Sequence, residues 1–229
     1  HEQNVEIPRA AVEMSHPLGV TVEGELGVLG GIEDGHGAGV TDSQVQDHLT
    51  DPNQAEDFVQ KTGLDALAVA IGTSHGAYKS GRKDPKTGEV LPPTLAMDRI
   101  HAIHEKMPNC HMVMHGSSSV PQELVDIINQ YGGKMPGTFG IPIEQIQDGI
   151  KHGVRKINVD TDSRLACTGA IRKVFAEKPA EFDMRKYLGP ARDAMKQVYI
   201  DRMLAFGQAG HAGDYKPMSL DDMKKVYGK

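Results

Sequence analysis

The strongest constraint on the fold is a regular alternation of short apolar segments with amphipathic segments. Residues 66–71 (ALAVAI) have the continuous hydrophobicity that is typical of a strand buried on both faces. The segment before them begins with Asp51-Pro52 and ends at Gly63, which are start and stop signals of a helix. The same two patterns recur along the chain, and strands that alternate with helices indicate βαβ units and a parallel sheet.

The expected elements can be placed along the whole chain. Strands are predicted over residues 20–26, 66–71, 111–114 and 155–159. Helices are predicted over residues 4–16, 51–63, 97–106, 121–130, 142–152, 162–177 and 185–206, and a polar loop over 79–93. A closed (β/α)8 barrel needs twice as many strands as these four. The sequence therefore predicts an α/β fold with an open sheet or half of a barrel, in a single domain over residues 1–229.

Composition excludes several classes of protein. The 229 residues carry a formal net charge of −6, which argues against a nucleic-acid partner because a basic surface is missing. Since the sequence contains neither a signal peptide nor an apolar run of about 18 residues, no membrane partner is expected. The two cysteines, Cys110 and Cys167, make no disulfide framework and suggest a reducing, cytoplasmic location.

Each predicted strand ends in a polar group that lies next to a glycine or a hydroxyl residue. The leading residues of these groups are Glu25, His75, His115 and Asn158. Because the carboxyl ends of parallel strands meet at one edge of the sheet, these side chains are expected to converge. Two imidazoles and a carboxylate are the ligand set of catalytic zinc, with one position left open for substrate. The alternative is that both histidines are ordinary core or loop residues; His101, on a predicted helix, is interpreted as solvated.

The same strand ends predict an anion site. Glycine lets backbone N–H groups approach an anion closely, and hydroxyl side chains add further donors. The residues proposed for this role are Gly76, Gly116, Ser117, Ser118 and Thr161, with Asn158 and Asp160 for substrate hydroxyls. Glu33 lies on a glycine-rich loop just after the first strand, where its carboxylate could act as a general acid or base.

Four long motifs in a fixed order carry a family resemblance. They are VEGELGVLGG, DALAVAIGTSHGAYK, HMVMHGSSSVPQEL and GVRKINVDTDSRLA. Together with the tail FGQAGHAGDYKPMSLDDM, they resemble the class II, metal-dependent fructose-1,6-bisphosphate aldolases, especially the bacterial and Calvin-cycle branch. The tagatose-bisphosphate aldolases share part of these motifs, but the forms NVDTD and HGSSSVP favour the fructose branch.

The resemblance implies a fold, an activity and a set of ligands. The family is a (β/α)8 TIM barrel, of which this chain would supply about the last four βα units and the C-terminal helices. It interconverts fructose 1,6-bisphosphate with dihydroxyacetone phosphate and glyceraldehyde 3-phosphate, as a homodimer or homotetramer. The implied cofactors are Zn²⁺ or another divalent transition metal, together with a monovalent cation.

Residue roles carried over from the motifs agree with the assignments made above. Glu25, His75 and His115 would be metal ligands, and Glu33 would move the proton at the enolate-forming carbon. Val159 would complete the phosphate pocket, and Arg185 would bind the second phosphate of a substrate in a neighbouring subunit. The resemblance assigns no Schiff-base lysine, and Lys156 on the last strand is expected to point away from the centre.

One family feature is missing from these residues. The family has an Asp-His pair on an earlier strand, which supplies the general acid and another metal ligand. We expect the first four strands, with this pair, to belong to the same protein outside the given residues, and a longer loop to follow Glu33. The alternatives are a metal-dependent barrel hydrolase and a non-catalytic half-barrel that binds sugar phosphates or a partner.

Overall fold

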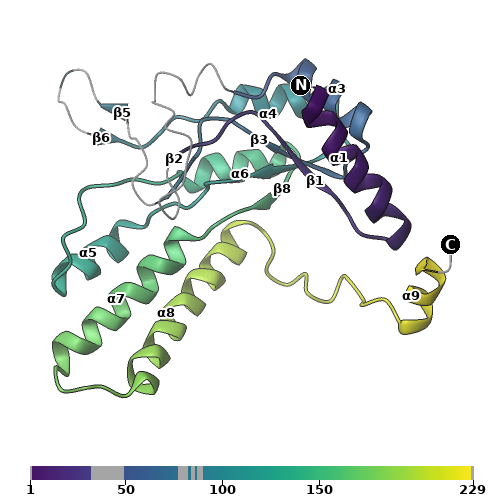
Figure 1. Ribbon diagram of the computed structural model, residues 1–229. Coiled ribbons are helices and arrows are strands. Elements are labelled where there is room, and N and C mark those ends of the chain that lie inside the picture. The colour runs from purple at the N-terminus through teal and green to yellow at the C-terminus, as the bar shows by residue number, and fades with distance from the viewer. Residues whose placement is uncertain (1, 32–48, 77–81, 84–85, 87–89, 228–229) are drawn as a thin grey trace.

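The centre of the molecule is a four-stranded parallel sheet (Figure 1). The computed structural model describes residues 2–31, 49–76, 82–83, 86 and 90–227. The strands lie in the order β1 (Glu23–Leu26), β3 (Ala66–Val69), β7 (His111–Met114) and β8 (Val154–Ile157). Each strand neighbours the next one of the sheet along the chain, without the reversal of order that marks a doubly wound sheet. This order is that of consecutive strands of a barrel.

The connecting helices follow the predicted order. They are α1 (Glu2–Ser15), the 3-10 helix η1 (His16–Leu18), α3 (Pro52–Thr62), α4 (Met97–Lys106), α5 (Gln122–Gln130), α6 (Ile143–Lys151), α7 (Thr161–Glu177), α8 (Met184–Ala205) and α9 (Leu220–Tyr227). Figure 1 shows α7 and α8 as a hairpin that projects from the sheet, and α9 at the end of an extended segment. The prediction did not include α9.

Two small sheets accompany the central one. β2 (Gly30–Gly31) pairs in parallel with β4 (Ser74–His75), and β5 (Arg82–Lys83) pairs in antiparallel with β6 (Val90–Leu91). The second pair falls in the segment 79–93 that was expected to be a loop, so that expectation is wrong for these four residues. The first pair holds His75, one of the predicted site residues, beside Gly31 in the register of a parallel ladder.

The start and stop signals of the second helix act as predicted. Oδ1 of Asp51 accepts hydrogen bonds from the backbone N–H groups of Asn53 and Gln54, at 2.9 and 3.0 Å. Gly63 ends the helix in the left-handed region, with φ +72°, and its N–H donates to the carbonyl of Val59. A side-chain cap and a left-handed glycine satisfy backbone groups that a helix leaves unpaired at its two ends.

The main core lies between one face of the sheet and the helices. Its members are side chains that alternate onto this face and the apolar sides of the helices, among them Leu67, Met112, Met114, Val154, Ile100, Ile103 and Ile146, all fully buried. Ala68 and Val113 are also buried but alternate onto the opposite face. Both faces of the central strands are therefore covered, as the apolar run 66–71 predicted.

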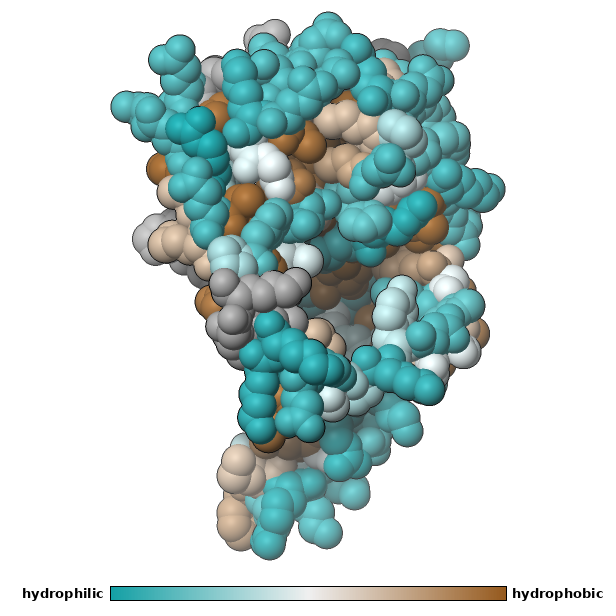
Figure 2. Space-filling model, turned by 90° about the vertical axis from the view of Figure 1, so that its right-hand side faces the viewer, coloured by the Kyte–Doolittle hydropathy of each residue, from teal (hydrophilic) through white to brown (hydrophobic). Residues whose placement is uncertain are grey.

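The outer surface is mainly polar. Figure 2, which looks at the side of the molecule that carries α1 and α9, shows hydrophilic residues over most of this face, with hydrophobic ones in scattered groups and in a hollow near its middle. Among the described residues, no helix combines the length and the apolar character that crossing a membrane requires.

One polar contact joins the beginnings of β1 and β3. Oδ2 of Asp65 accepts a hydrogen bond from the backbone N–H of Val22 at 2.7 Å and lies 2.9 Å from Nε2 of His16. The bond from Val22 is the main cause that holds the pKa of Asp65 below its ordinary value, against a smaller opposing effect of burial. The contact with His16 lowers this pKa further.

The lowered pKa of Asp65 predicts how the free energy of unfolding depends on pH. A carboxylate with a lowered folded pKa stabilises the native state above its unfolded pKa of about 3.8 and loses that contribution as the pH falls through the folded value. We expect Asp65→Asn to lower the free energy of unfolding by up to about 1 kcal/mol at pH 7, since the pair is partly exposed. Urea unfolding at pH 7 and pH 3 measures the difference, and an equal loss at both values would contradict the assignment.

Candidate functional site

A pocket of about 260 Å³ lies at the carboxyl ends of the strands. Its walls come from the ends of β4, β7 and β8 and from the first residues of α7. The lining residues are His75, Gly76, His115, Gly116, Ser118, Asn158, Asp160 and Thr161. Every one of them belongs to the set that the sequence predicted, so the structure brings together residues from three separate strand ends.

The two predicted histidines face each other across this pocket. The ring centroids of His75 and His115 are 6.2 Å apart, with the rings tilted by 55°. His75 is carried by the short strand β4, and His115 follows β7 directly. Two imidazoles from different strands at one sheet edge are the type of ligand pair that zinc and related metals use.

A carboxylate contacts His115 of this pair, but it is Glu23 and not Glu25. Oε1 of Glu23 lies 3.1 Å from Nε2 of His115, and its Oε2 accepts a hydrogen bond from Nζ of Lys156 at 2.7 Å. Burial works to raise the pKa of Glu23, but the hydrogen bonds and charges of Lys156 and His115 outweigh it and hold the pKa below its ordinary value. Glu23 was missed although it stands two residues before Glu25 in VEGEL, and this spacing puts both on one face of β1.

The contact with Glu23 corrects the expectation for Lys156. The side chain was expected to point away from the centre, but it lies on the same face of the sheet as Glu23 and Val113. The physical reason is the two-residue period of a strand, which places Lys156 and Asn158 on one face. The ladder is also irregular between Met112 and Val113, and this shift sets Lys156 opposite Val113.

The structure brings two of the three predicted metal ligands together, the histidines but not Glu25. Glu25 is exposed on β1, next to Ala68 in the ladder, and within the described residues no hydrogen bond or ion pair joins it to either histidine. Within the described residues, the one group of three ligand atoms that lie within 4.8 Å of one another is elsewhere, in His101, Asp148 and His152. The assignment of Glu25, His75 and His115 as one ligand set therefore stays a prediction.

Glycine at position 116 is required by the shape of the pocket wall. The residue has φ +60°, and a Cβ added there would lie 2.5 Å from the carbonyl oxygen of Ser74. Gly76, on the other side of the pocket, has φ +85°. These are conformations that L side chains rarely adopt, so both glycines let the backbone line the pocket directly.

The hydroxyls of the serines after Gly116 form hydrogen bonds mainly with backbone groups of the protein. Ser118 is buried, and its Oγ accepts hydrogen bonds from the backbone N–H groups of Asp160 and Thr161, both at 3.1 Å. Ser117 is fully buried, and its Oγ donates to the carbonyls of Met114 and His115. They therefore fix the pocket walls, and Ser118 in addition lines the pocket.

Other predicted residues lie away from the pocket. Val159 contributes instead to a small hollow beside α8, together with Tyr199 and Arg202. Arg185 is exposed at the start of α8 and is ion-paired with its neighbour Asp183 at 2.7 Å, and this hydrogen bond raises the pKa of Arg185. The length of α7 separates Arg185 from the pocket by roughly 25 Å. Glu33 lies outside the described residues.

A buried carboxylate that the sequence reasoning missed fixes the loop of the site. Asp162 is fully buried, and its oxygens accept hydrogen bonds from the backbone N–H groups of Ser119 and Val120 at 3.2 and 2.8 Å. Both Nε and Nη2 of Arg202 on α8 donate to its Oδ2, at 3.1 and 2.8 Å. The signal in the sequence was the run NVDTD at the end of a strand, which was assigned only to substrate binding.

Asp162 also holds a strained residue. Val120 has φ +50°, which is a conformation that costs a β-branched residue of the order of 1–3 kcal/mol. Its N–H is bound by Asp162, and its carbonyl accepts a hydrogen bond from Nε2 of Gln122 at 2.9 Å. The loop between β7 and α5 is thus held in one conformation from both sides.

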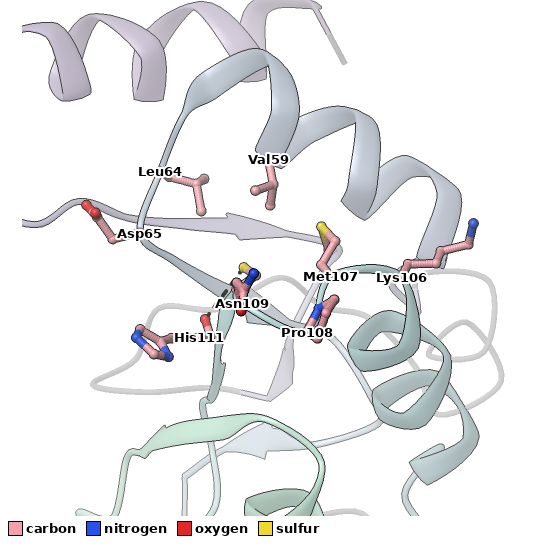
Figure 3. A pocket seen from close by; sticks show the side chains of 9 residues that line it. Val59, Leu64, Asp65, Lys106, Met107, Pro108, Asn109 and His111 are labelled. Carbon is pink, nitrogen blue, oxygen red and sulfur yellow. Dashed lines mark hydrogen bonds between the residues drawn. The ribbon is translucent and has the colours of Figure 1, made fainter.

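A second and larger hollow lies at the amino ends of the strands. Figure 3 shows its lining, which includes Leu64 and Asp65 before β3, and Lys106 to His111 between α4 and β7. Cys110 lies in this lining, and burial raises the pKa of its thiol, with a backbone hydrogen bond to Leu67 acting in the opposite direction. A thiol with a raised pKa is a poor nucleophile, so the hollow lacks the character of a thiol active site.

The chain matches a known family over most of its length. The sequence profile described as "Fructose-bisphosphate aldolase class-II" matches residues 1–211. The fructose-bisphosphate aldolase 2 of Cereibacter sphaeroides is 55% identical over 99% of this chain and 64% of its own length. The fructose-bisphosphate aldolase of Nostoc commune is 53% identical over 100% of this chain and 64% of its own length. The chain thus spans less than two thirds of these relatives.

The fold has a counterpart among solved structures. The X-ray structure of the YdjI aldolase from Escherichia coli K12 superimposes with a TM-score of 0.62 at 27% sequence identity. The similarity covers 92% of this chain and 58% of that one. The fold comparison and the sequence comparisons therefore point to the same group of proteins, and in each case the chain spans only part of the relative's length.

The network around Asp162 predicts a large effect on stability. Asp162→Ala should lower the free energy of unfolding by about 3 kcal/mol or more, because it leaves the guanidinium of Arg202 and the backbone N–H groups of Ser119 and Val120 without their partner. Denaturant unfolding measures this loss. The matched control is Asp193→Ala, which removes an exposed aspartate paired with Arg192 and should change stability by less than about 0.5 kcal/mol. Similar losses for both variants would contradict the role given to Asp162.

Proposed function

Since the chain belongs to the class II fructose-bisphosphate aldolase family, we propose that the protein cleaves and forms fructose 1,6-bisphosphate. The products of cleavage are dihydroxyacetone phosphate and glyceraldehyde 3-phosphate. The observation that carries the proposal is the pocket at the carboxyl ends of the strands, in which two histidines, two glycines of positive φ and the beginning of α7 come together. Active sites of (β/α)8 barrels are built at this end.

The phosphate of the ketose would bind between the glycines and α7. Gly76 and Gly116 expose backbone there, and the first turn of α7 adds the positive end of a helix dipole. Ser117 and Ser118 would fix the phosphate loop, and Val159 would support the pocket from behind. The side chains of Asn158 and Asp160 would take substrate hydroxyls, while Arg164 pairs with Asp160 at 2.8 Å and offsets its charge.

The family is metal-dependent, and this chain has two imidazole donors at the pocket and a carboxylate, Glu25, on β1. His75, His115 and Glu25 would hold a divalent transition metal, which we propose to be Zn²⁺, since two imidazoles and a carboxylate suit it. A bound ion of this kind supplies Lewis-acid polarisation of the ketone oxygen. Glu23 would orient the ring of His115 through the contact at 3.1 Å. The monovalent cation is proposed from the family resemblance alone.

The proton at the carbon next to the ketone would be moved by Glu33, which is proposed from its motif alone. A carboxylate has the basicity for this transfer if it comes within hydrogen-bonding reach of the carbon-bound proton. Among the described residues, no strand end carries a counterpart of the family's general-acid aspartate. The proposed reaction therefore needs a general acid in addition to the residues named here.

The active form is proposed to be a homodimer or homotetramer in the cytoplasm. Arg185 supports this proposal, because it is exposed at the far end of the α7–α8 hairpin and cannot reach its own pocket. From that position its guanidinium would bind the second phosphate of a substrate held by a neighbouring subunit. Size-exclusion chromatography with light scattering measures the assembly.

The proposed ligand set makes a prediction about the bound metal. In the purified full-length protein, His75→Ala and His115→Ala should each remove the bound ion and lower aldol cleavage by more than about a hundredfold. The measurements are metal content by mass spectrometry and the rate of triose phosphate release. The matched control is His111→Ala, at the opposite end of the strand that precedes His115, which should leave both unchanged. Full metal content and activity in either His75→Ala or His115→Ala would overturn the ligand assignment.

The role proposed for Glu33 makes a prediction about proton transfer. Glu33→Ala should keep the metal and lower kcat by about a hundredfold or more, because it removes a proton-transfer group and no ligand. The rate at which the proton on the carbon next to the ketone exchanges for deuterium in deuterium oxide should fall in parallel. Glu13→Ala, an exposed change on α1, serves as control. Loss of the metal in Glu33→Ala, or an unchanged exchange rate, would contradict the proposed role.

A further inference from the structure

We propose that His101, Asp148 and His152 form a second binding site, for a divalent transition-metal ion, on the outer surface of helices α4 and α6. The three residues come from two neighbouring helices, and a ligand atom from each lies within 4.8 Å of the others. None of them lines the pocket proposed for catalysis. From the sequence, His101 was interpreted as a solvated residue, and Asp148 and His152 were assigned no role.

The three side chains already contact one another. Nε2 of His101 lies 3.0 Å from Oδ2 of Asp148, and Nδ1 of His152 lies 3.4 Å from Oδ1 of the same carboxylate. The centroids of the two imidazole rings are 3.8 Å apart. In a tetrahedral zinc site with bonds of about 2.1 Å, ligand atoms lie roughly 3.4 Å apart. Small side-chain rotations would therefore bring these donors to an ion.

The helices hold these donors in place. Asp148 and His152 are four residues apart at the end of α6, which puts them on one side of the helix. His101 projects from α4, whose Ile103 is fully buried in the same core cluster as Ile146 of α6. A cluster on two packed helices is better defined than a cluster on a loop.

The position of the cluster separates it from the proposed catalytic site. His152 comes directly before Gly153 and β8, so it lies near the amino end of that strand. The catalytic pocket is at the carboxyl ends, where His115 and Asn158 follow their strands. The two groups of histidines therefore lie toward opposite ends of the strands, and an ion at one cannot share ligands with the other.

The donor types and the exposure define the ligand class. Two imidazoles and one carboxylate suit Zn²⁺, Co²⁺, Ni²⁺ or Cu²⁺ better than Mg²⁺ or Ca²⁺, which prefer oxygen donors. The three side chains are 36–39% exposed, so an ion can enter from solvent and keep water on its remaining position. Nδ1 of His152 also lies 2.9 Å from the backbone carbonyl of Asp148, and an ion bound through this nitrogen would replace that contact.

The bound ion would act as a link between the two helices. In its absence, Asp148 joins them through the hydrogen bond with His101. An ion with ligands from both helices would replace this contact with stronger ones and stabilise the folded form relative to the unfolded chain. This stabilisation gives the site a readout that does not depend on catalysis.

The test isolates the new site from the catalytic one. In full-length protein that carries His75→Ala and His115→Ala, freed of metal with chelator, titration with Zn²⁺ should show one ion bound per chain. Zn²⁺ should also raise Tm. Adding His101→Gln or His152→Gln should weaken zinc binding by more than about tenfold and remove the rise in Tm. Binding of Co²⁺ should give the visible absorption of a nitrogen- and oxygen-coordinated ion, which the same substitutions should abolish.

Controls keep the result unambiguous. His211→Gln removes an exposed histidine that also contacts an aspartate, Asp214 at 2.7 Å, but belongs to no three-residue cluster of the described residues, and should leave zinc binding unchanged. If the catalytic-site background does not fold, zinc is counted in otherwise unaltered protein, with and without His101→Gln and His152→Gln, and one equivalent should be lost. No zinc binding in the background protein, or binding that both glutamine variants retain, would overturn the proposal. Either result would leave the aldolase assignment untouched, because that rests on other residues.

Discussion

The buried carboxylate of Asp162 is the interaction on which the geometry of the pocket depends. It binds two backbone N–H groups of the loop after β7 and the guanidinium of Arg202 on α8, while its own backbone belongs to the first turn of α7. A charge inside a protein is tolerated only when it is paired and hydrogen-bonded, so the three segments must stay together for it to remain there. Ser118 adds a second link across the same junction. The pocket walls are therefore fixed before any ligand is present.

The parallel sheet divides the molecule into two ends with different chemistry. At the carboxyl ends, loops with glycine, serine and histidine converge on the pocket of about 260 Å³. The amino ends carry the hollow around Cys110 (Figure 3) and, on the outer helices, the cluster of His101, Asp148 and His152. This division follows from strand direction alone, because parallel strands bring all their ends of one kind to the same edge. It explains why one chain can present two separate groups of histidines.

Much of the fold could be predicted because its signals are local. The limits of α4 and β7 agree with the predicted ranges, and the Asp51 cap and the Gly63 stop are as expected. The differences from the prediction lie where contacts between residues far apart in the chain determine the local structure. The pair β5–β6 forms in a segment without strand-like periodicity, and α9 follows a polar tail that gave no strong signal. Lys156 was misplaced because its face depends on strand alternation and on the irregular pairing of β7 with β8.

The sequence by itself determined the order of strands and helices, the family and the residues that gather at the carboxyl ends. It could do so because apolar periodicity, caps and motif strings are properties of neighbouring residues. Only the tertiary structure decided which carboxylate contacts His115, what Asp162 binds, and that His101 meets Asp148 and His152. Each of these depends on a distance between residues far apart in the chain, as with Glu23 and Lys156, and such a distance is set by packing and register rather than by local pattern.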